Sequence, residues 1–89
     1  MTFAEFAEIS TEQQMDAIWE WGFYVGKSSE KNSIHVLYSL NGFFVEVLMD
    51  KETASVIETR AYHLLDDTLL KRYGLSLSNP FIRAGDGIY

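Results

Sequence analysis

Residues 34–49 read Ile34-His-Val-Leu-Tyr-Ser-Leu-Asn-Gly-Phe-Phe-Val-Glu-Val-Leu-Met49, and this stretch decides the fold. Two runs of β-branched and aromatic residues, which favour strands, flank the dipeptide Asn41-Gly42. Asn-Gly suits a type I′ turn, because both central residues of that turn need a positive φ. A two-residue turn also sets which residues face each other, so the sequence predicts an antiparallel hairpin with Leu40 opposite Phe43.

The two faces of this hairpin differ in character. One face is almost entirely apolar and is therefore the predicted core face, with the residues Ile34, Val36, Tyr38, Leu40, Phe43, Val45, Val47 and Met49. The second face has three facing pairs, which are His35 with Leu48, Leu37 with Glu46, and Ser39 with Phe44. Because this second face mixes apolar and polar side chains, it is neither a plain core face nor a plain solvent face.

The size and composition of the chain indicate one folded domain. Its 89 residues suit a single domain, predicted as residues 1–89 with residues 75–89 as a C-terminal tail. A hydrophobic fraction of 47% and an aromatic fraction of 15% favour a packed core over disorder. The sequence has no cysteine, no basic signal-peptide start and no apolar run of about 18 residues, so we expect a cytoplasmic protein.

The net charge restricts the classes of partner. It is −6 at pH 7, with a pI of about 4.7. Binding to nucleic-acid phosphates needs a basic surface, so we expect no nucleic-acid partner. The lack of an apolar span likewise predicts no membrane partner. The acidity either serves solubility or attracts a basic partner.

Two capping patterns mark helices before the hairpin. Thr2 and Ser10 are followed three residues later by Glu and Gln, as in a capping box. A short helical turn after Thr2 is therefore predicted, followed by a helix over residues 11–21. The longer helix has an apolar stripe at positions i, i+3, i+4 and i+7, which we expect to cover the hairpin's core face: Met15, Ile18, Trp19 and Gly22.

Acidic residues recur every four positions along these two helical segments, at Glu8, Glu12, Asp16 and Glu20. No lysine or arginine precedes Lys27. If the two segments are continuous, the four carboxylates form a ridge of one sign, which we call the acidic ridge. It is either a solvated helix face or a docking strip for a basic surface, and both interpretations fit the sequence.

The rest of the chain predicts two further strands and a second helix. Strands are expected over residues 23–27 and 54–60, on either side of the hairpin, and a helix from Tyr62 to Tyr73. The fold class is thus α+β, with an N-terminal helix, a four-stranded antiparallel β-meander and a C-terminal helix. The register of the fourth strand stays open, because either Val56 or Ile57 could face the core.

The register expected for the first strand affects the second sheet face. If Ser28 lies opposite Ser33, Phe23 and Val25 face the core. Tyr24 then joins the other face. That face would carry a contiguous apolar patch of Tyr24, Leu37, Phe44 and Leu48. Either the C-terminal helix and tail cover this patch, or it is an interface for a homodimer or for another protein.

The sequence offers no recognisable catalytic or metal-binding pattern. His35 and His63 are far apart and no H-x-x-x-H or C-x-x-C spacing occurs, so we expect no metal. Asp66 and Asp67 are neighbours on a helix and point about 100° apart, which suits the helix dipole better than a paired catalytic site. There is no phosphate-binding loop or nucleophile elbow, so we expect neither enzyme activity nor a cofactor. His35 and Glu46 are interpreted as a structural cross-strand or diagonal pair.

Three segments resemble a group of short uncharacterised bacterial proteins. They are Ser10-Thr-Glu12 through Ile18-Trp19, Gly22-Phe-Tyr-Val25, and Leu37-Tyr-Ser-Leu-Asn-Gly-Phe-Phe-Val-Glu-Val47. In that group a helix ending in an aromatic residue precedes a strand meander with a Leu-Tyr-x-Leu-x-x-Phe-x-Val-Glu-Val core. The resemblance covers residues 10–60 and implies a helix followed by a four-stranded meander. It implies no functional residues.

Three classes of function fit these observations. The first is a protein-interaction module that binds through the sheet face, the acidic ridge or both, in the manner of an acidic inhibitor or immunity protein. The alternative is a ligand-binding or accessory subunit, with a pocket between the sheet and the C-terminal helix. Four residues are predicted to line that pocket: Tyr38, Tyr62, His35 and Trp19. The third is a purely structural subunit of a larger assembly.

Overall fold

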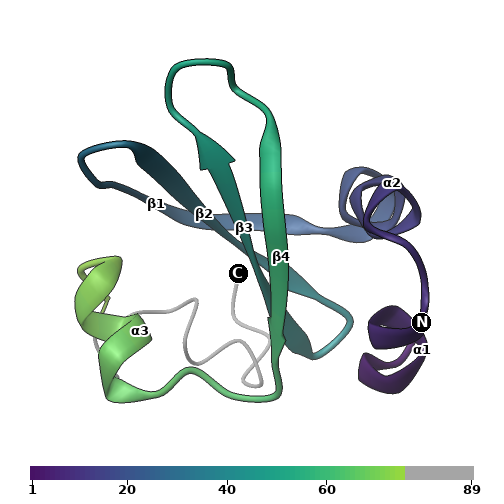
Figure 1. Cartoon of the computed structure of the whole chain (residues 1–89). Helices are drawn as coiled ribbons and strands as arrows, with labels where there is room; N and C mark the ends of the chain where they lie inside the picture. Colours follow the sequence, from purple (N-terminus) through teal and green to yellow (C-terminus); the bar gives the residue numbers. More distant parts are fainter. Residues whose placement is uncertain (76–89) are drawn as a thin grey trace.

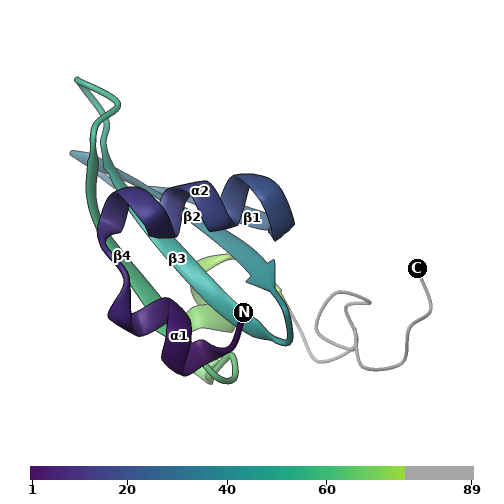
Figure 2. The same cartoon turned by 90° about the vertical axis from the view of Figure 1, so that its right-hand side faces the viewer.

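The computed structural model describes residues 1–75, which form an antiparallel sheet with helices on both faces (Figure 1). The elements in chain order are α1 (Phe3–Glu8), α2 (Thr11–Trp21), β1 (Phe23–Ser29), β2 (Ser33–Leu40), β3 (Phe43–Asp50), β4 (Val56–Tyr62) and α3 (Asp67–Arg72). The strand order β1-β2-β3-β4 is a meander. Helices α1 and α2 lie on one face of the sheet, and α3 lies on the other (Figure 2). The predicted α+β class is confirmed, while the predicted tail falls outside the described residues except for Leu75.

The central hairpin has the predicted turn and the predicted register. Asn41 has a φ of 51° and Gly42 a φ of 89°, as a type I′ turn requires. Leu40 pairs with Phe43, and the pairing continues without a bulge to the far end of the hairpin. The face covered by α1 and α2 forms the main core, which consists of Phe6, Ala17, Ile18, Leu40, Phe43, Val45 and Val47.

Both N-terminal helices begin at the predicted capping boxes, formed by Thr2 with Glu5 and by Ser10 with Gln13. The buried side chain of Gln14 then ties three elements together. Its Nε2 donates a hydrogen bond of 2.9 Å to the carbonyl of Phe6, and its Oε1 accepts a hydrogen bond from the hydroxyl of Thr59. This amide joins α2 to α1 and to β4, so α2 is held firmly over the sheet.

The predicted apolar stripe of α2 was partly wrong. Ile18 is buried, but Trp19 is 82% exposed. The residues of α2 that are buried against the sheet are Gln14, Ala17 and Ile18, at i, i+3 and i+4. The helix is therefore rotated away from Trp19, because Gln14 finds hydrogen-bond partners in the interior and takes a position that the apolar pattern had assigned to solvent.

The predicted register of β1 was also wrong. The connecting loop is shorter than expected, because β1 continues to Ser29 and pairs there with Ile34. The pairing then shifts at a bulge between Tyr24 and Gly26. As a result Tyr24 lies opposite Tyr38 on the α1/α2 face, where the two rings pack edge to face with centroids 6.3 Å apart.

The C-terminal helix is shorter than predicted. Tyr62 still belongs to β4, where it pairs with Phe44, and α3 begins only at Asp67. Asp66 caps α3, because its Oδ1 accepts a hydrogen bond of 2.9 Å from the amide of Leu69. In β4, a shift places Val56 opposite Met49, so Val56 packs against the core while Ile57 is exposed.

Candidate functional site

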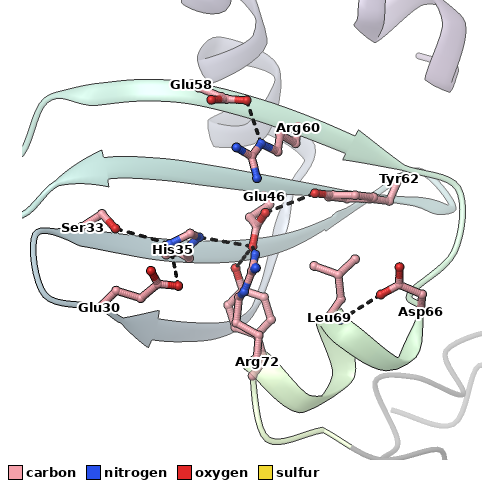
Figure 3. A network of polar contacts seen from close by, with 11 residues as sticks. Glu30, Ser33, His35, Glu46, Glu58, Arg60, Tyr62, Asp66, Leu69 and Arg72 are labelled. Carbon is pink, nitrogen blue, oxygen red and sulfur yellow. Dashed lines mark hydrogen bonds and ion pairs between the residues drawn. The ribbon is translucent and has the colours of Figure 1, made fainter.

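The second sheet face is organised around the buried carboxylate of Glu46, in the middle of β3 (Figure 3). Its side chain is 0% exposed. Arg72 Nη1 donates a hydrogen bond of 2.6 Å to Glu46 Oε2, and the hydroxyl of Tyr73 donates one of 2.7 Å to the same oxygen. The hydroxyl of Tyr62 lies 3.3 Å from Oε1. We call Glu46 with Arg72, Tyr73, Tyr62 and His35 the Glu46 network.

Two features of the fold, the register of the sheet and the position of α3, bring these groups together. The register of the sheet sets Tyr62 of β4 diagonally from Glu46 of β3, since Tyr62 pairs with Phe44. Arg72 and Tyr73 instead arrive from the end of α3, 26 and 27 residues further along the chain. Glu46 therefore holds α3 against the sheet by charge-assisted hydrogen bonds, which are the strongest class in proteins.

His35 extends the network toward the β1–β2 loop. Its Nδ1 lies 3.4 Å from Glu46 Oε2 without forming a hydrogen bond, and its Nε2 lies 3.2 Å from an oxygen of Glu30. Ser33 Oγ is 3.4 Å from the same Nε2. The imidazole is buried between two carboxylates, so the predicted pairing of His35 with Glu46 is confirmed as a diagonal neighbour contact.

Arg60 is the cation that the sheet itself places opposite Glu46. Its Nε, however, donates a hydrogen bond of 2.7 Å to Glu58 on the same strand. The only described ion pair of Glu46 with an arginine is the one with Arg72. Compensation of the buried charge thus depends on α3 rather than on the neighbouring strand.

The electrostatics of the network favour a charged carboxylate and neutral phenols. Burial raises the pKa of Glu46, but the hydrogen bonds from Tyr73 and Arg72 outweigh it and hold the pKa below its ordinary value. Burial and the hydrogen bond to Glu46 raise the pKa of Tyr73, and burial and the charge of Glu46 raise that of Tyr62. The hydrogen bond to Glu46 raises the pKa of Arg72.

These shifts predict stability losses at both ends of the pH scale. The lowered pKa of Glu46 contributes stability that is present above its ordinary value of 4.5 and is lost as the pH falls through the folded-state value. The raised pKa of Tyr73 contributes stability that is complete below its ordinary value of 10.0 and is lost as the pH rises beyond it. Tyr73→Phe should therefore flatten both limbs and cost about 1.5–3 kcal/mol at pH 7.

The measurement is the free energy of unfolding in urea from pH 3 to pH 11. Tyr24→Phe is the matched control, because Tyr24 is exposed and lies on the opposite sheet face. Equal pH profiles for Tyr73→Phe and Tyr24→Phe would show that the network does not govern the pH dependence.

The apolar patch predicted on the second sheet face does not form an exposed surface. Leu37 is fully buried, and Phe44 and Leu48 are half-buried. Tyr24 lies on the other face because of the bulge in β1. The buried residues Leu69 and Leu70 of α3 lie on this side of the sheet, so the part of the face around Leu37 belongs to the interior.

The predicted ligand pocket between the sheet and the C-terminal helix is not formed by the residues assigned to it. His35 and Tyr62 face α3, whereas Tyr38 lies on the α1/α2 face and Trp19 is exposed. Two surface hollows of about 610 Å³ each lie elsewhere. One is lined by the loops around Lys31 and Lys51, and the other by the N-terminus and the Asn41-Gly42 turn.

The acidic ridge is exposed but interrupted. Ile9 and Ser10 have extended backbone conformations between α1 and α2, so Glu8 does not continue the helical line of the others. Glu12, Asp16 and Glu20 lie one turn apart on the exposed side of α2. The ridge proper thus consists of these three residues.

Two tryptophans that sequence reasoning did not assign to a surface lie beside this ridge. Trp19 is 82% exposed and Trp21 is 50% exposed. Residues two apart on a helix point about 160° apart, so the two indoles lie on opposite flanks of Glu20. The spacing itself carried the signal, because a helix with one buried face cannot bury both members of Trp-Glu-Trp.

Within residues 1–75, no helix is long and apolar enough to cross a membrane. The described part of the chain also contains no group of three or more histidine, aspartate or glutamate side chains arranged to hold a metal ion. No protein-family model matches the sequence, and comparisons with curated proteins and with solved structures give no match. The resemblance to short bacterial proteins therefore stays a prediction.

Proposed function

We propose that the protein is a small interaction module whose exposed α2 surface binds a basic surface on another protein, as an acidic inhibitor or immunity protein does. The observation that carries this proposal is the 82% exposure of Trp19 beside Glu12, Asp16 and Glu20. We call these four residues the α2 surface. It combines a large aromatic side chain with charges of one sign.

Physical considerations support a binding role for this surface. Tryptophan is enriched among the residues that dominate interface energies. A row of carboxylates also attracts a basic partner and orients it during encounter. Because Gln14 bonds both to α1 and to β4, α2 is held in place before binding. Less ordering entropy is then lost on association.

The charge of the α2 surface also selects the kind of partner. Residues 1–26 contain no lysine or arginine, so two copies that met through this surface would bring like charges together. Each contact between like charges costs about 2–5 kcal/mol at an interface. A basic partner is therefore favoured over a homodimer through α2.

The proposal is tested by placing a photo-crosslinking amino acid at position 11, which is exposed at the start of α2 next to Glu12, and purifying the captured protein. Its affinity is then measured for the unmodified chain and for variants. Trp19→Ala should weaken binding about 30-fold, equivalent to about 2 kcal/mol. The triple change Glu12→Gln, Asp16→Asn and Glu20→Gln should weaken it at least tenfold and flatten its salt dependence.

A second triple variant controls for net charge alone, with the changes Glu52→Gln, Glu58→Gln and Asp67→Asn. These residues are exposed and lie away from α2. The control should keep its affinity within about twofold at physiological salt. Equal losses in the two triple variants, an unaffected Trp19→Ala variant, or the absence of any captured protein would contradict the proposal.

A further inference from the structure

The buried imidazole of His35 has one nitrogen that the Glu46 network does not satisfy. The residue is 5% exposed. Its Nδ1 is the only buried side-chain nitrogen or oxygen within residues 1–75 that lacks a hydrogen-bond partner. Buried polar atoms are normally paired, because an unpaired one has lost its bonds to water and gained none in return. The reason for this exception lies in the oxygen that Nδ1 faces.

Nδ1 faces an oxygen whose acceptor positions are already occupied. It lies 3.4 Å from Oε2 of Glu46 (Figure 3). A carboxylate oxygen has two lone pairs, and those of Oε2 accept hydrogen bonds from Arg72, at 2.6 Å, and from Tyr73, at 2.7 Å. Both donors come from the end of α3. Docking of α3 and a hydrogen bond from Nδ1 are therefore alternatives at the same oxygen.

The other ring nitrogen, Nε2, suits either protonation state of the imidazole. When the ring is neutral, the hydroxyl of Ser33, which lies 3.4 Å away, can donate to Nε2. When the ring is protonated, Nε2 can donate to Oε1 of Glu30, which lies 3.2 Å away. Histidine is also the side chain whose charge most readily changes between about pH 5 and pH 8. The surroundings of the ring thus accommodate both states.

The charged groups around the ring determine how a proton on it affects α3. Glu46 of β3 and Glu30 of the β1–β2 loop attract an imidazolium whether or not α3 is docked, because neither belongs to α3. Arg72 repels the imidazolium, and it does so only while α3 is docked. After undocking, a protonated His35 can replace Arg72 as the cation beside Glu46. Protonation of the ring therefore favours the undocked state of α3.

The remaining neighbours of the ring do not change this sign. On β1, the residue opposite the ring is the uncharged Ser28. On β4, Glu58 and Arg60 form an ion pair with each other and add no net charge. Burial holds the pKa values of Tyr62 and Tyr73 above the ordinary value of 10.0, so both phenols are neutral where histidine titrates.

We propose that His35 is an acid-sensitive release switch for α3. When the ring takes up a proton, its Nδ1–H replaces the two donors of α3 on Oε2 of Glu46. Because the undocked state binds the additional proton, the docked state loses stability as the pH falls through the range in which histidine titrates. Release uncovers Leu69 and Leu70, which are buried in the docked state. The switch acts on the sheet face opposite α2, so it goes beyond the proposed function.

NMR of the full chain between pH 5.5 and pH 8.5 tests the switch. Glu46 stays charged throughout, because the hydrogen bonds from α3 hold its pKa below 4.5. Long-range correlations of the ring nitrogens give the protonation state of His35, and relaxation dispersion of the Leu69 and Leu70 methyl groups gives the undocked population. We expect this population to rise about fivefold from pH 8.5 to pH 5.5, in step with protonation of the ring.

The methyl groups of Val45 and Val47 in the main core separate release of α3 from unfolding of the domain. They should show no rise of the same size, because the rest of the sheet stays folded. An equal rise at the core methyl groups would overturn the proposal, since acid would then unfold the whole domain.

Three variants identify the group that responds. His35→Gln should remove the pH dependence of the undocked population. His63→Gln is the matched control and should keep it, because that imidazole stacks on Phe3, with ring centroids 3.9 Å apart. Tyr73→Phe frees one acceptor position on Oε2, so the ring of His35 should be protonated in a larger fraction of molecules at a given pH.

The unmodified chain decides the proposal even if His35→Gln does not fold. A ring that keeps one protonation state from pH 5.5 to pH 8.5 would overturn it. So would an undocked population that is constant or falls on acidification, and so would a response that survives in His35→Gln or disappears in His63→Gln.

Discussion

Replacing Arg72 by methionine should lower the free energy of unfolding by about 3–5 kcal/mol, because it leaves the carboxylate of Glu46 buried without its cation. Glu46 is fully buried, and Arg72 lies 2.6 Å from it. A domain of this size has a total stability of about 5–10 kcal/mol, so the variant should lose a large part of it. Urea unfolding at pH 7 and low temperature measures the loss.

Lys71→Met is the matched control for this prediction. Lys71 is the neighbouring residue on α3, carries the same charge and is exposed, so its loss should cost less than about 0.5 kcal/mol. The triple change Glu46→Leu, Arg72→Met and Tyr73→Phe should recover most of the stability, since it removes the buried charge without leaving the hydroxyl of Tyr73 unpaired. A loss below 1 kcal/mol in Arg72→Met would instead mean that Arg60 turns from Glu58 to Glu46.

Phe43→Ala should also cost about 3–5 kcal/mol, through loss of apolar burial and the cavity that remains. Phe43 is 3% exposed and is the first residue of β3. Its ring packs edge to face on Phe3 and tilted on Phe6, with centroids 5.8 Å and 5.6 Å away. The substitution therefore removes one of the main contacts of α1 with the sheet, beside the stacking of Phe3 on His63.

Phe23→Ala provides the comparison, because the same side chain is 71% exposed at the start of β1. Its truncation should change the free energy of unfolding by less than about 0.5 kcal/mol. Denaturant midpoints of the two variants, measured together, check the difference. If the two alanine variants were equally stable, the packing of α1 on Phe43 would contribute nothing to the fold.

The central hairpin was predictable because local chemistry determines it. Asn41-Gly42 has the conformation that its turn type demands, and the alternation on both strands then fixes every facing pair. The two capping boxes were predictable for the same reason, since Thr2 and Ser10 act on residues three positions away. Each of these features depends on a few consecutive residues.

The features that sequence reasoning missed depend on residues far apart in the chain. Trp19 is exposed because Gln14 finds partners on α1 and β4, and no periodicity in α2 reveals those partners. Arg72 lies near the end of the helix predicted from Tyr62 to Tyr73, and nothing in the neighbouring sequence indicates its main contact, which is Glu46. Only the docking of α3 across the sheet brings the two together.

The bulge in β1 belongs to the same class of missed features. An extra residue at Val25 moves Tyr24 from one sheet face to the other, and with it one member of the predicted interaction patch. The one local signal is Gly26, which bounds the shift, because a glycine inside a strand often marks a bulge. Exposed aromatic side chains thus lie both on α2 and at the start of β1, where Phe23 and Tyr24 are exposed.

The short length of α3 has a consequence for the order in which the protein folds. An isolated helix needs about 12–15 residues to be stable in water, and α3 has six. It can therefore persist only once the sheet has formed and presents Glu46 to it, so the docking of α3 follows the formation of the sheet. Hydrogen exchange at the amide of Leu70, which bonds to the carbonyl of Asp66, then reports undocking of this helix alone. Exchange at Val45 and Val47 in the core reports the opening of the whole domain.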